Sequence, residues 1–308
     1  MFSQTNTQKW EKLGLIIKPD ARYGWMKTHA MVPVVQARQG DVHRVYFSGR
    51  DDHNRSLIGY ADIDLKDPCK ILRVSPHPVL GLGELGCFDD NGVTPSWIVE
   101  HQGRTFLYYI GWNQKSTVRM SLVAGLAVSD DDGESFQRVL RVPILERTHQ
   151  EPYLLNTGPC VLMEGNVWRM WYVSGVGWDN PDLPRYNIKY AESKDGVSWE
   201  RKGIVCIDFQ SKAEHAIARP CVIKEDGKYK MWYSYKGEQY RIGYAESKDG
   251  ISWIRMDGMV AIDVSAQGWD SQMIEYAFVL RHKTRKHMFY NGNDYGKKGI
   301  GYAVMEDA

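Results

Sequence analysis

The decapeptide Tyr190-Ala-Glu-Ser-Lys-Asp-Gly-Val-Ser-Trp199 returns almost unchanged as Tyr244-Ala-Glu-Ser-Lys-Asp-Gly-Ile-Ser-Trp253. Weaker copies are Leu126-Ala-Val-Ser-Asp-Asp-Asp-Gly-Glu-Ser-Phe136, Tyr60-Ala-Asp-Ile-Asp64 and Tyr302-Ala303. The shared alanines lie 54 to 66 residues apart, a period that is too long for a helical solenoid and suits a propeller blade of four strands. The repeat therefore predicts an all-β chain that folds as a single five-bladed β-propeller domain over residues 1–308.

Two more recurring segments predict the first and second strands of each blade. The segment before each Tyr-Ala pair is rich in aromatic and β-branched residues, which suit a half-buried pleated surface. One strand earlier, four copies carry an apolar run marked by a proline, which predicts that the first strand starts near that proline; these are Val32-Pro33, Thr94-Pro95, Gly158-Pro159 and Arg219-Pro220, with Tyr276-Ala277 in the fifth copy. The blades are expected to span roughly 28–80, 89–145, 151–208, 214–263 and 270–308.

The fifth copy stops soon after its third strand, so its outer strand has to come from elsewhere. The segment Trp10-Glu-Lys-Leu-Gly-Leu-Ile-Ile17 reads like Trp199-Glu-Arg-Lys-Gly-Ile-Val-Cys206, which belongs to a predicted fourth strand. Residues 10–17 are therefore expected to complete the last blade and to close the ring, which removes an edge that would otherwise invite aggregation.

The amino-acid composition and charge limit the classes of binding partner that are expected. The net charge is +1 and no basic run stands out, so neither nucleic acid nor an anionic membrane surface is an expected partner. No apolar run approaches the length of a membrane span, and the first residues lack the features of a signal peptide. The five cysteines show no paired spacing and are expected to be reduced, which predicts a cytoplasmic location; the oligomeric state stays open. The cysteines are Cys69, Cys87, Cys160, Cys206 and Cys221.

The segments just before the predicted first strands differ from copy to copy, and they contain the residues whose side chains could bind or react with a ligand. Carboxylates from different blades could surround one ligand at the axis: Asp90, Glu151, Glu214 and Glu275. Polar and aromatic side chains in the same approaches and in the loops after the second strands add His29, Arg50, Trp112, Trp178, His215 and Arg219. Aromatic rings beside carboxylates suit a sugar, because a ring stacks on its apolar face and carboxylates bind its hydroxyl groups. By contrast, Asp131, Asp195 and Asp249 recur in tight turns and are predicted to be structural.

The Ser-x-Asp-Gly-x-x-Trp turns, the Met-Trp-Tyr second strands and the axial carboxylates resemble the glycosidase superfamily of arabinanases, β-xylosidases and invertases (families 43 and 32). The resemblance implies cleavage of glycosidic bonds, with a base or nucleophile from the first blade, a tuning Asp and a Glu acid from a middle blade. This chain departs from the pattern at one place. An Asp is expected near the start of the first inner strand, but Met31-Val32 precede Pro33.

On this resemblance Glu151 is predicted to be the general acid, and Asp90 or Glu275 the base or nucleophile. Glu214 is expected to bind the substrate or to tune the catalytic carboxyl groups. Hydrolysis needs two carboxyl groups across the scissile bond, and a crowd of carboxylates in a partly buried funnel would raise the pKa of the acid. The substrate-binding residues are expected to be His29, Arg50, Trp112, Trp178, Glu214, His215 and Arg219.

Two alternatives stay open. The family 130 mannoside phosphorylases share this architecture and use inorganic phosphate, which Arg50, His215, Arg219 and His29 could bind here. A carbohydrate-binding propeller without catalysis would also explain the missing first-blade Asp, because fold does not establish function. No ligand spacing demands a metal, although an axial calcium ion held by some relatives leaves that cofactor as an expectation.

Overall fold

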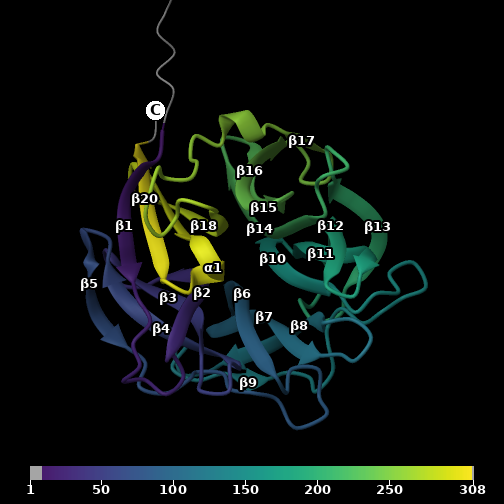
Figure 1. Cartoon of the computed structure of the whole chain (residues 1–308), viewed down its shortest axis with the longest axis horizontal. Coiled ribbons are helices and arrows are strands. Elements are labelled where there is room, and N and C mark those ends of the chain that lie inside the picture. Colours follow the sequence, from purple (N-terminus) through teal and green to yellow (C-terminus); the bar gives the residue numbers. More distant parts are fainter. Residues whose placement is uncertain (1–8, 307–308) are drawn as a thin grey trace, which may run out of the picture.

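The computed structural model describes residues 9–306 as an almost entirely β-stranded chain (Figure 1). Its strands form consecutive groups of four, here called units 1 to 5. Unit 1 holds β2 (Thr28–Ala37), β3 (Val42–Arg50), β4 (Ser56–Asp64) and β5 (Asp67–Val74). Unit 2 holds β6 (Gly92–His101), β7 (Arg104–Gln114), β8 (Met120–Ser129) and β9 (Gln137–Arg138).

The remaining units follow the same order. Unit 3 holds β10 (Asn156–Glu164), β11 (Val167–Asn180), β12 (Leu183–Ser193) and β13 (Glu200–Ile207). Unit 4 holds β14 (Ala216–Glu225), β15 (Lys228–Lys236), β16 (Tyr240–Ser247) and β17 (Trp253–Arg255). Unit 5 holds β18 (Glu275–His282), β19 (Arg285–Asn291), β20 (Ile300–Glu306) and the N-terminal strand β1 (Glu11–Ile17). Two short helical turns are η1 (Asp257–Met259) and α1 (Asn293–Gly296).

Within each unit the neighbouring strands pair antiparallel. The first strands β2, β6, β10, β14 and β18 lie closest to the middle of the molecule in Figure 1. Each contacts the first strand of the next unit, and β18 contacts β2 in turn. The five first strands therefore surround a common axis.

The prediction that residues 10–17 pair with the last strand is confirmed. Strand β1 runs antiparallel to β20, with Lys12 opposite Ala303, Gly14 opposite Tyr302 and Leu15 opposite Gly301. The chain thus joins its first and last described strands in one sheet. Trp10, just before β1, is 3% exposed and meets Trp232 of unit 4 edge to face, so this segment also packs against the neighbouring unit.

The repeated turns behave as the sequence predicts. The Asp249 carboxylate accepts hydrogen bonds from the backbone N–H groups of Ile251 and Ser252 at 2.8 and 2.7 Å. The aromatic residue that follows each turn contacts a ring of the preceding unit, in the pairs Phe136–Tyr46, Trp199–Tyr108 and Trp253–Trp171. These turns therefore stabilise the contacts between units.

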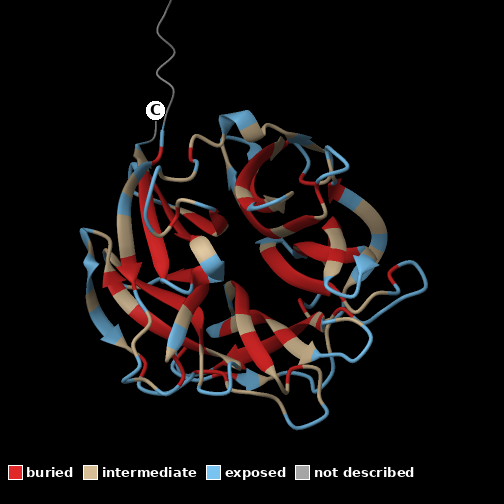
Figure 2. Cartoon of the chain, viewed as in Figure 1, coloured by how far each residue is buried: buried red, intermediate tan, exposed pale blue. Residues whose placement is uncertain are grey.

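One sequence expectation about the first strands is corrected. The proline does not start them: Pro33, Pro95, Pro159 and Pro220 all lie inside their strands, after several residues that already have partners. Buried residues concentrate along these inner strands, while the outer strands are more exposed (Figure 2). Among the described residues no helix is long and apolar enough to cross a membrane.

Candidate functional site

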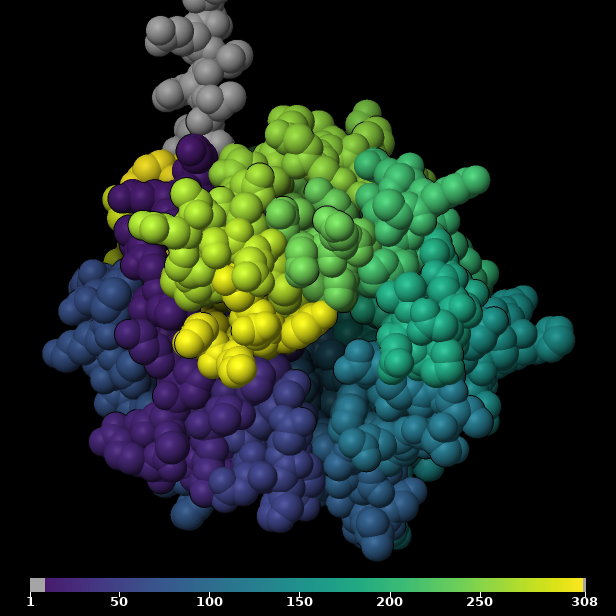
Figure 3. Space-filling view, viewed as in Figure 1, coloured from purple at the N-terminus to yellow at the C-terminus, as the bar shows by residue number. Residues whose placement is uncertain are grey.

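A cavity of about 740 Å³ lies at the axis and receives residues from all five units. Figure 3 shows a hollow in the middle of the displayed face, beside the part of the chain that carries α1. The pairing of every first strand is interrupted near the proline position: between residues 31 and 34, 157 and 160, 218 and 221, and 275 and 278, and one residue later in unit 2, between 95 and 97. Such bulges turn side chains in a new direction and are frequent next to active sites.

In units 1, 3, 4 and 5 the residue before the proline, or before Ala277, lies in this interruption and lines the cavity: Val32, Gly158, Arg219 and Tyr276. Thr94 of unit 2 also lines the cavity, but it is still paired with Ile110. Val32, Arg219 and Tyr276 have φ values of 54°, 55° and 56°, which are unfavourable for residues with large or branched side chains. The next residue in four units is a proline, which has no N–H for the ladder. Side chains hold two of the bulges, because Asn291 accepts from the Val32 N–H and Ser234 from the Tyr276 N–H, both at 2.8 Å.

Arg219 is the buried charge of the cavity. Its side chain is 3% exposed and donates from Nη1 to the Ser96 carbonyl at 2.6 Å and from Nη2 to the Pro33 carbonyl at 2.8 Å. Its Nε has no hydrogen-bond partner, and burial lowers the pKa of Arg219 to about 10. No carboxylate of the described chain forms an ion pair with this guanidinium.

The remaining wall is cationic and aromatic. Arg50, Lys115, Arg119 and Lys236 line it together with Trp112, Tyr186, Tyr240 and Tyr295. Tyr186 and Tyr240 join their hydroxyl groups at 2.8 Å, and Lys236 donates to the Tyr295 hydroxyl at 2.9 Å. Among the described lining residues, Asp182, on the exposed turn between β11 and β12, supplies the carboxylate.

Glu275 lies beside this wall without lining it. The residue is 0% exposed, and neither of its carboxyl oxygens has a hydrogen-bond partner among the described residues. Burial raises the pKa of Glu275 well above its usual range, against the opposing effect of the Lys236 charge. Its neighbours Tyr240 and Tyr276 both line the cavity and both interact electrostatically with it. Burial therefore favours the protonated form of the Glu275 carboxyl group.

Of the residues that the sequence nominated, Arg50, Trp112, His215 and Arg219 line the cavity. Four nominated carboxylates do not meet around it, contrary to the expectation. Asp90 accepts hydrogen bonds from Asn113 and from the backbone N–H of Gly86. His29 and Trp178 are half-buried and also lie outside the lining, although the pKa of His29 is lowered to about 4 by burial and by the nearby charges of Arg50 and Lys297.

Glu151 takes part in an ion pair inside unit 3 instead of facing the cavity. Its Oε1 accepts from the Tyr172 hydroxyl at 2.7 Å and from Lys189 at 3.2 Å, and its Oε2 from Arg201 at 2.7 Å. Glu151 is 1% exposed. Both carboxylate oxygens are thus occupied by partners inside unit 3, whereas a general acid must reach the leaving group of the substrate.

Other units repeat this arrangement, which we call the carboxylate clamp. An acidic residue before the first strand bonds to a tyrosine of the second strand and to a cation of the fourth, as in Asp89–Tyr109–Arg138 and Asp270–Tyr290–Lys12. In unit 4, Arg255 joins Glu214 to Asp257, and Asp257 accepts from Tyr233. Unit 1 places Trp25 against Phe47 at the corresponding place. The clamp therefore holds a unit together.

Sequence reasoning missed several residues of the cavity: Arg119, Asp182, Tyr186, Lys236, Tyr240, Tyr276 and Tyr295. Tyr276 had a usable signal, because it stands where the other copies read a residue before proline. The described residues contain no group of three or more His, Cys, Asp or Glu side chains that could hold a metal. The cationic wall also does not suit calcium, which prefers several carboxylate and carbonyl oxygens.

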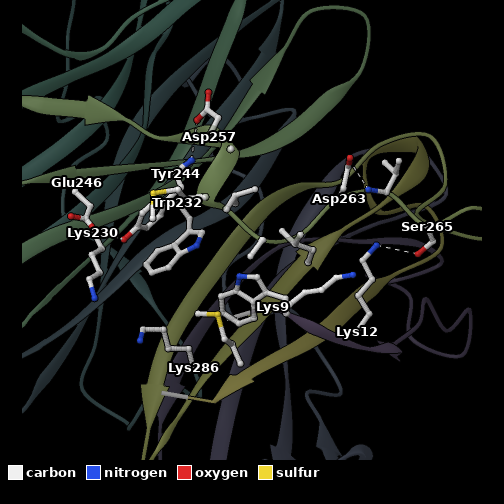
Figure 4. Close-up of a pocket in the computed structure, with 18 residues that line it drawn as sticks. Lys9, Lys12, Lys230, Trp232, Tyr244, Glu246, Asp257, Asp263, Ser265 and Lys286 are labelled. Atoms are coloured by element: carbon white, nitrogen blue, oxygen red, sulfur yellow. Dashed lines mark hydrogen bonds between the residues drawn. The ribbon is translucent and has the colours of Figure 1, made fainter. Parts of the chain in front are cut away.

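A second groove, of about 1190 Å³, lies between units 4 and 5 (Figure 4). It opens where β17 is only three residues long. Three of its four lysines have partners: Lys12 donates to Ser265 and Asp270, and Lys230 and Lys286 both pair with Glu225. The axial cavity, with its unpaired charges and bulged strands, is the better candidate for a site.

Two proteins of Mycobacterium tuberculosis, named uncharacterized proteins MT1551 and Rv1502, are 41% and 40% identical to this chain over 299 residues. Each match covers 97% of this chain and 99% of the relative. The chain belongs to their family. No protein-family model matches it.

Among solved structures, a chain named "Glycoside hydrolase" superposes with a TM-score of 0.76 at 20% identity, over 98% of this chain and 94% of the other. A thermostable family-43 glycoside hydrolase gives 0.66 at 16% identity, over 93% and 91%. A family 130 structure, from work on mannoside phosphorylases and hydrolases of β-1,2 mannosidic linkages, gives 0.71 at 14%, over 99% and 95%. The predicted resemblance to the propeller glycosidases is thus confirmed as a likeness of fold.

Proposed function

We propose that this family cleaves glycosidic bonds in carbohydrates bound in the axial cavity, as a glycoside hydrolase. The observation that carries the proposal is the interrupted pairing near the proline position of all five first strands, beside a common cavity that residues of every unit line. Strained backbone persists only where the surroundings impose it, and it concentrates at functional sites. We also propose that the five units are the blades of a β-propeller that β1 closes.

Glu275 is the proposed proton donor. Cleavage requires a proton for the leaving oxygen, and a carboxyl group kept neutral by burial can supply one. The proton would pass through Tyr240 or Tyr276 after substrate binding brings the hydroxyl within hydrogen-bonding distance of Glu275; that hydroxyl donates to the leaving oxygen and takes the Glu275 proton in its place. Both tyrosines line the cavity and interact electrostatically with Glu275, which supports this route.

Asp182 is the proposed base. Hydrolysis needs a second carboxyl group, which removes a proton from water as the water attacks the sugar carbon. Asp182 lines the cavity from an exposed turn, so its carboxylate can be reached by water. The glycosidic bond breaks, water supplies a hydroxyl group to one product, and its second proton ends on Asp182.

Phosphorolysis is the second candidate, and the cationic wall favours it. Inorganic phosphate attacks without a protein base, so one proton donor would suffice. Arg50, His215 and Arg219 were expected from the sequence to bind phosphate, and all three line the cavity. A third reading, binding without catalysis, draws support from the ion pairs that hold Glu151 and Glu214.

The deciding experiment screens aryl glycosides with and without phosphate, using wild-type protein and the variants Glu275→Gln and Asp182→Asn. For a hydrolase, both variants should lose about 10²–10⁴-fold in turnover of substrates with poor leaving groups. For a phosphorylase, Asp182→Asn should keep its phosphate-dependent turnover. Unchanged turnover in Glu275→Gln would remove Glu275 from the acid role, and sugar binding without any turnover would leave the chain a binding protein.

A further inference from the structure

The cations of the axial cavity differ from the other basic side chains of the described chain. Many arginines elsewhere sit against carboxylates, as Arg44, Arg138, Arg201 and Arg255 do. Five basic residues that line the cavity form no ion pair within the described chain: Arg50, Lys115, Arg119, Arg219 and Lys236. The cavity therefore carries positive charge that the protein itself does not neutralise.

Arg219 shows that this charge is unfavourable without a ligand. A buried charge is normally paired, because taking it out of water is costly. Arg219 is 3% exposed, its two terminal nitrogens bind only carbonyl oxygens, and its Nε–H lacks any partner. Thr157, which also lines the cavity, has a buried hydroxyl with no partner either. An anionic group that reaches these atoms would satisfy both.

The wall adds repulsion between like charges. Burial is the largest cause of the lowered pKa of Arg50, and the nearby charge of Arg119 lowers it further. Arg50 donates only to the amide oxygen of Asn54, at 2.9 Å. Two guanidinium groups that act on each other without a carboxylate between them are stabilised by an oxyanion that both can bind.

The placement of the charges favours a ligand larger than a free ion. Arg50 belongs to unit 1, Arg119 to unit 2, and Arg219 and Lys236 to unit 4. Arg219 is buried whereas Arg119 is exposed, so the charges lie at different depths of a cavity that is about 740 Å³ in volume. Aromatic side chains, Trp112 and Tyr295 among them, line the same space. Charge combined with stacking surface suits a sugar that carries its own negative group.

We propose that the axial cavity binds an acidic sugar, whose carboxylate is held by Arg219 together with Arg50 and Arg119. This inference rests on the proposed function, since it assumes that the cavity takes carbohydrate. Inorganic phosphate offers the same oxyanion chemistry without the sugar ring, and the experiment has to separate the two.

The test is isothermal titration calorimetry of the full chain with D-glucuronate and D-galacturonate, with D-glucose and D-galactose as neutral counterparts, and with inorganic phosphate. At least one uronate should bind about tenfold or more tightly than its neutral counterpart, since a charge-assisted hydrogen bond contributes that much. The affinity should fall as salt is raised. Arg219→Met should abolish the preference; because this buried change can impair folding, Arg50→Gln on the wall serves as the second variant and should weaken uronate binding about tenfold.

Arg141→Gln is the matched control, because Arg141 is exposed, pairs with Glu84 and lies outside the cavity lining; it should leave uronate binding unchanged. Absence of uronate binding, or equal affinity for neutral sugars, would overturn the proposal. So would phosphate binding that depends on Arg219 and Arg50 without any uronate preference. Turnover of neutral glycosides alone would contradict the acidic substrate but leave the proposed glycoside cleavage intact. Uronate binding without turnover of any glycoside would support the acidic ligand and contradict glycoside cleavage.

Discussion

The carboxylate clamp of unit 3 makes a quantitative prediction that separates a structural from a catalytic Glu151. In Glu151→Gln, one carboxylate oxygen is replaced by an NH₂ group, which cannot accept from Arg201. The charge opposite Lys189 and Arg201 is lost as well. Removing one partner of a buried ion pair costs about 3–5 kcal/mol, and Glu151 is 1% exposed with cations at 2.7 and 3.2 Å. The melting temperature should fall by roughly 5–8 °C, because an unfolding entropy of about 2.1 cal/mol/K per residue over 308 residues makes each kcal/mol worth about 1.5 °C.

Thermal and urea unfolding, followed by circular dichroism, measure this loss. Glu200→Gln is the matched control, since the Glu200 carboxylate is 68% exposed and contacts only Lys202, at 3.2 Å; it should cost about 0.5 kcal/mol or less. Unchanged stability of Glu151→Gln, together with a large loss of glycoside turnover, would refute the structural assignment. Glu151 would then be the general acid that the sequence predicts.

Three further predictions concern the turns, a histidine and the N-terminal strand. Asp249→Asn should lower the free energy of unfolding by about 1 kcal/mol. Backbone hydrogen bonds from Ser252 and Ile251 lower the pKa of Asp249 in the folded protein. The stability that Asp249 contributes is therefore present above its pKa in the unfolded chain and is lost as the pH falls through its pKa in the folded protein. A pH-independent difference between Asp249→Asn and wild type would contradict this. The pKa of His29 is lowered to about 4 in the folded protein, so the unfolded chain binds the proton more readily. His29 should therefore make the free energy of unfolding fall as the pH drops from about 6.5 towards 4. In urea unfolding, His29→Gln should show a smaller decrease in the free energy of unfolding over that pH range. Trp10→Ala should lower the free energy of unfolding by about 3–5 kcal/mol, because a buried indole is removed. Leu13→Ala on the same segment should lower it far less, because Leu13 is 42% exposed. Equal effects of the two substitutions would show that this segment adds little to stability.

Local chemistry explains why the strands and turns could be predicted from the sequence. The Asp226-Gly227 pair, for example, has φ values of 53° and 73° and joins β14 to β15 as a two-residue hairpin, which its composition predicts. The repeat also revealed the partner of residues 10–17, because a similar sequence, residues 199–206, leads into and forms the fourth strand of unit 3.

The direction of side chains could not be predicted in the same way. Glu151 and Glu275 both approach a first strand, yet one enters a clamp and the other lies beside the cavity tyrosines. A shift of one residue reverses the face that a strand residue points to, and the bulges introduce such shifts at the decisive position. The clamp did leave a trace in the sequence, since an acidic residue before the first strand recurs with Arg138, Arg201 and Arg255 in or near the fourth.

The pairing of β1 with β20 has a consequence for how the protein is made. Leu15 and Gly301 are partners, so β1, near the start of the chain, cannot pair until β20, near its end, has been synthesised. At a synthesis rate of about 5–20 residues per second the wait on the ribosome is roughly 15–60 s. During that time the edge of β1 that pairs with β20 is unoccupied, and such an edge is a target for other chains. Chaperone dependence of newly made protein should therefore be greater than that of the same chain refolding at full length.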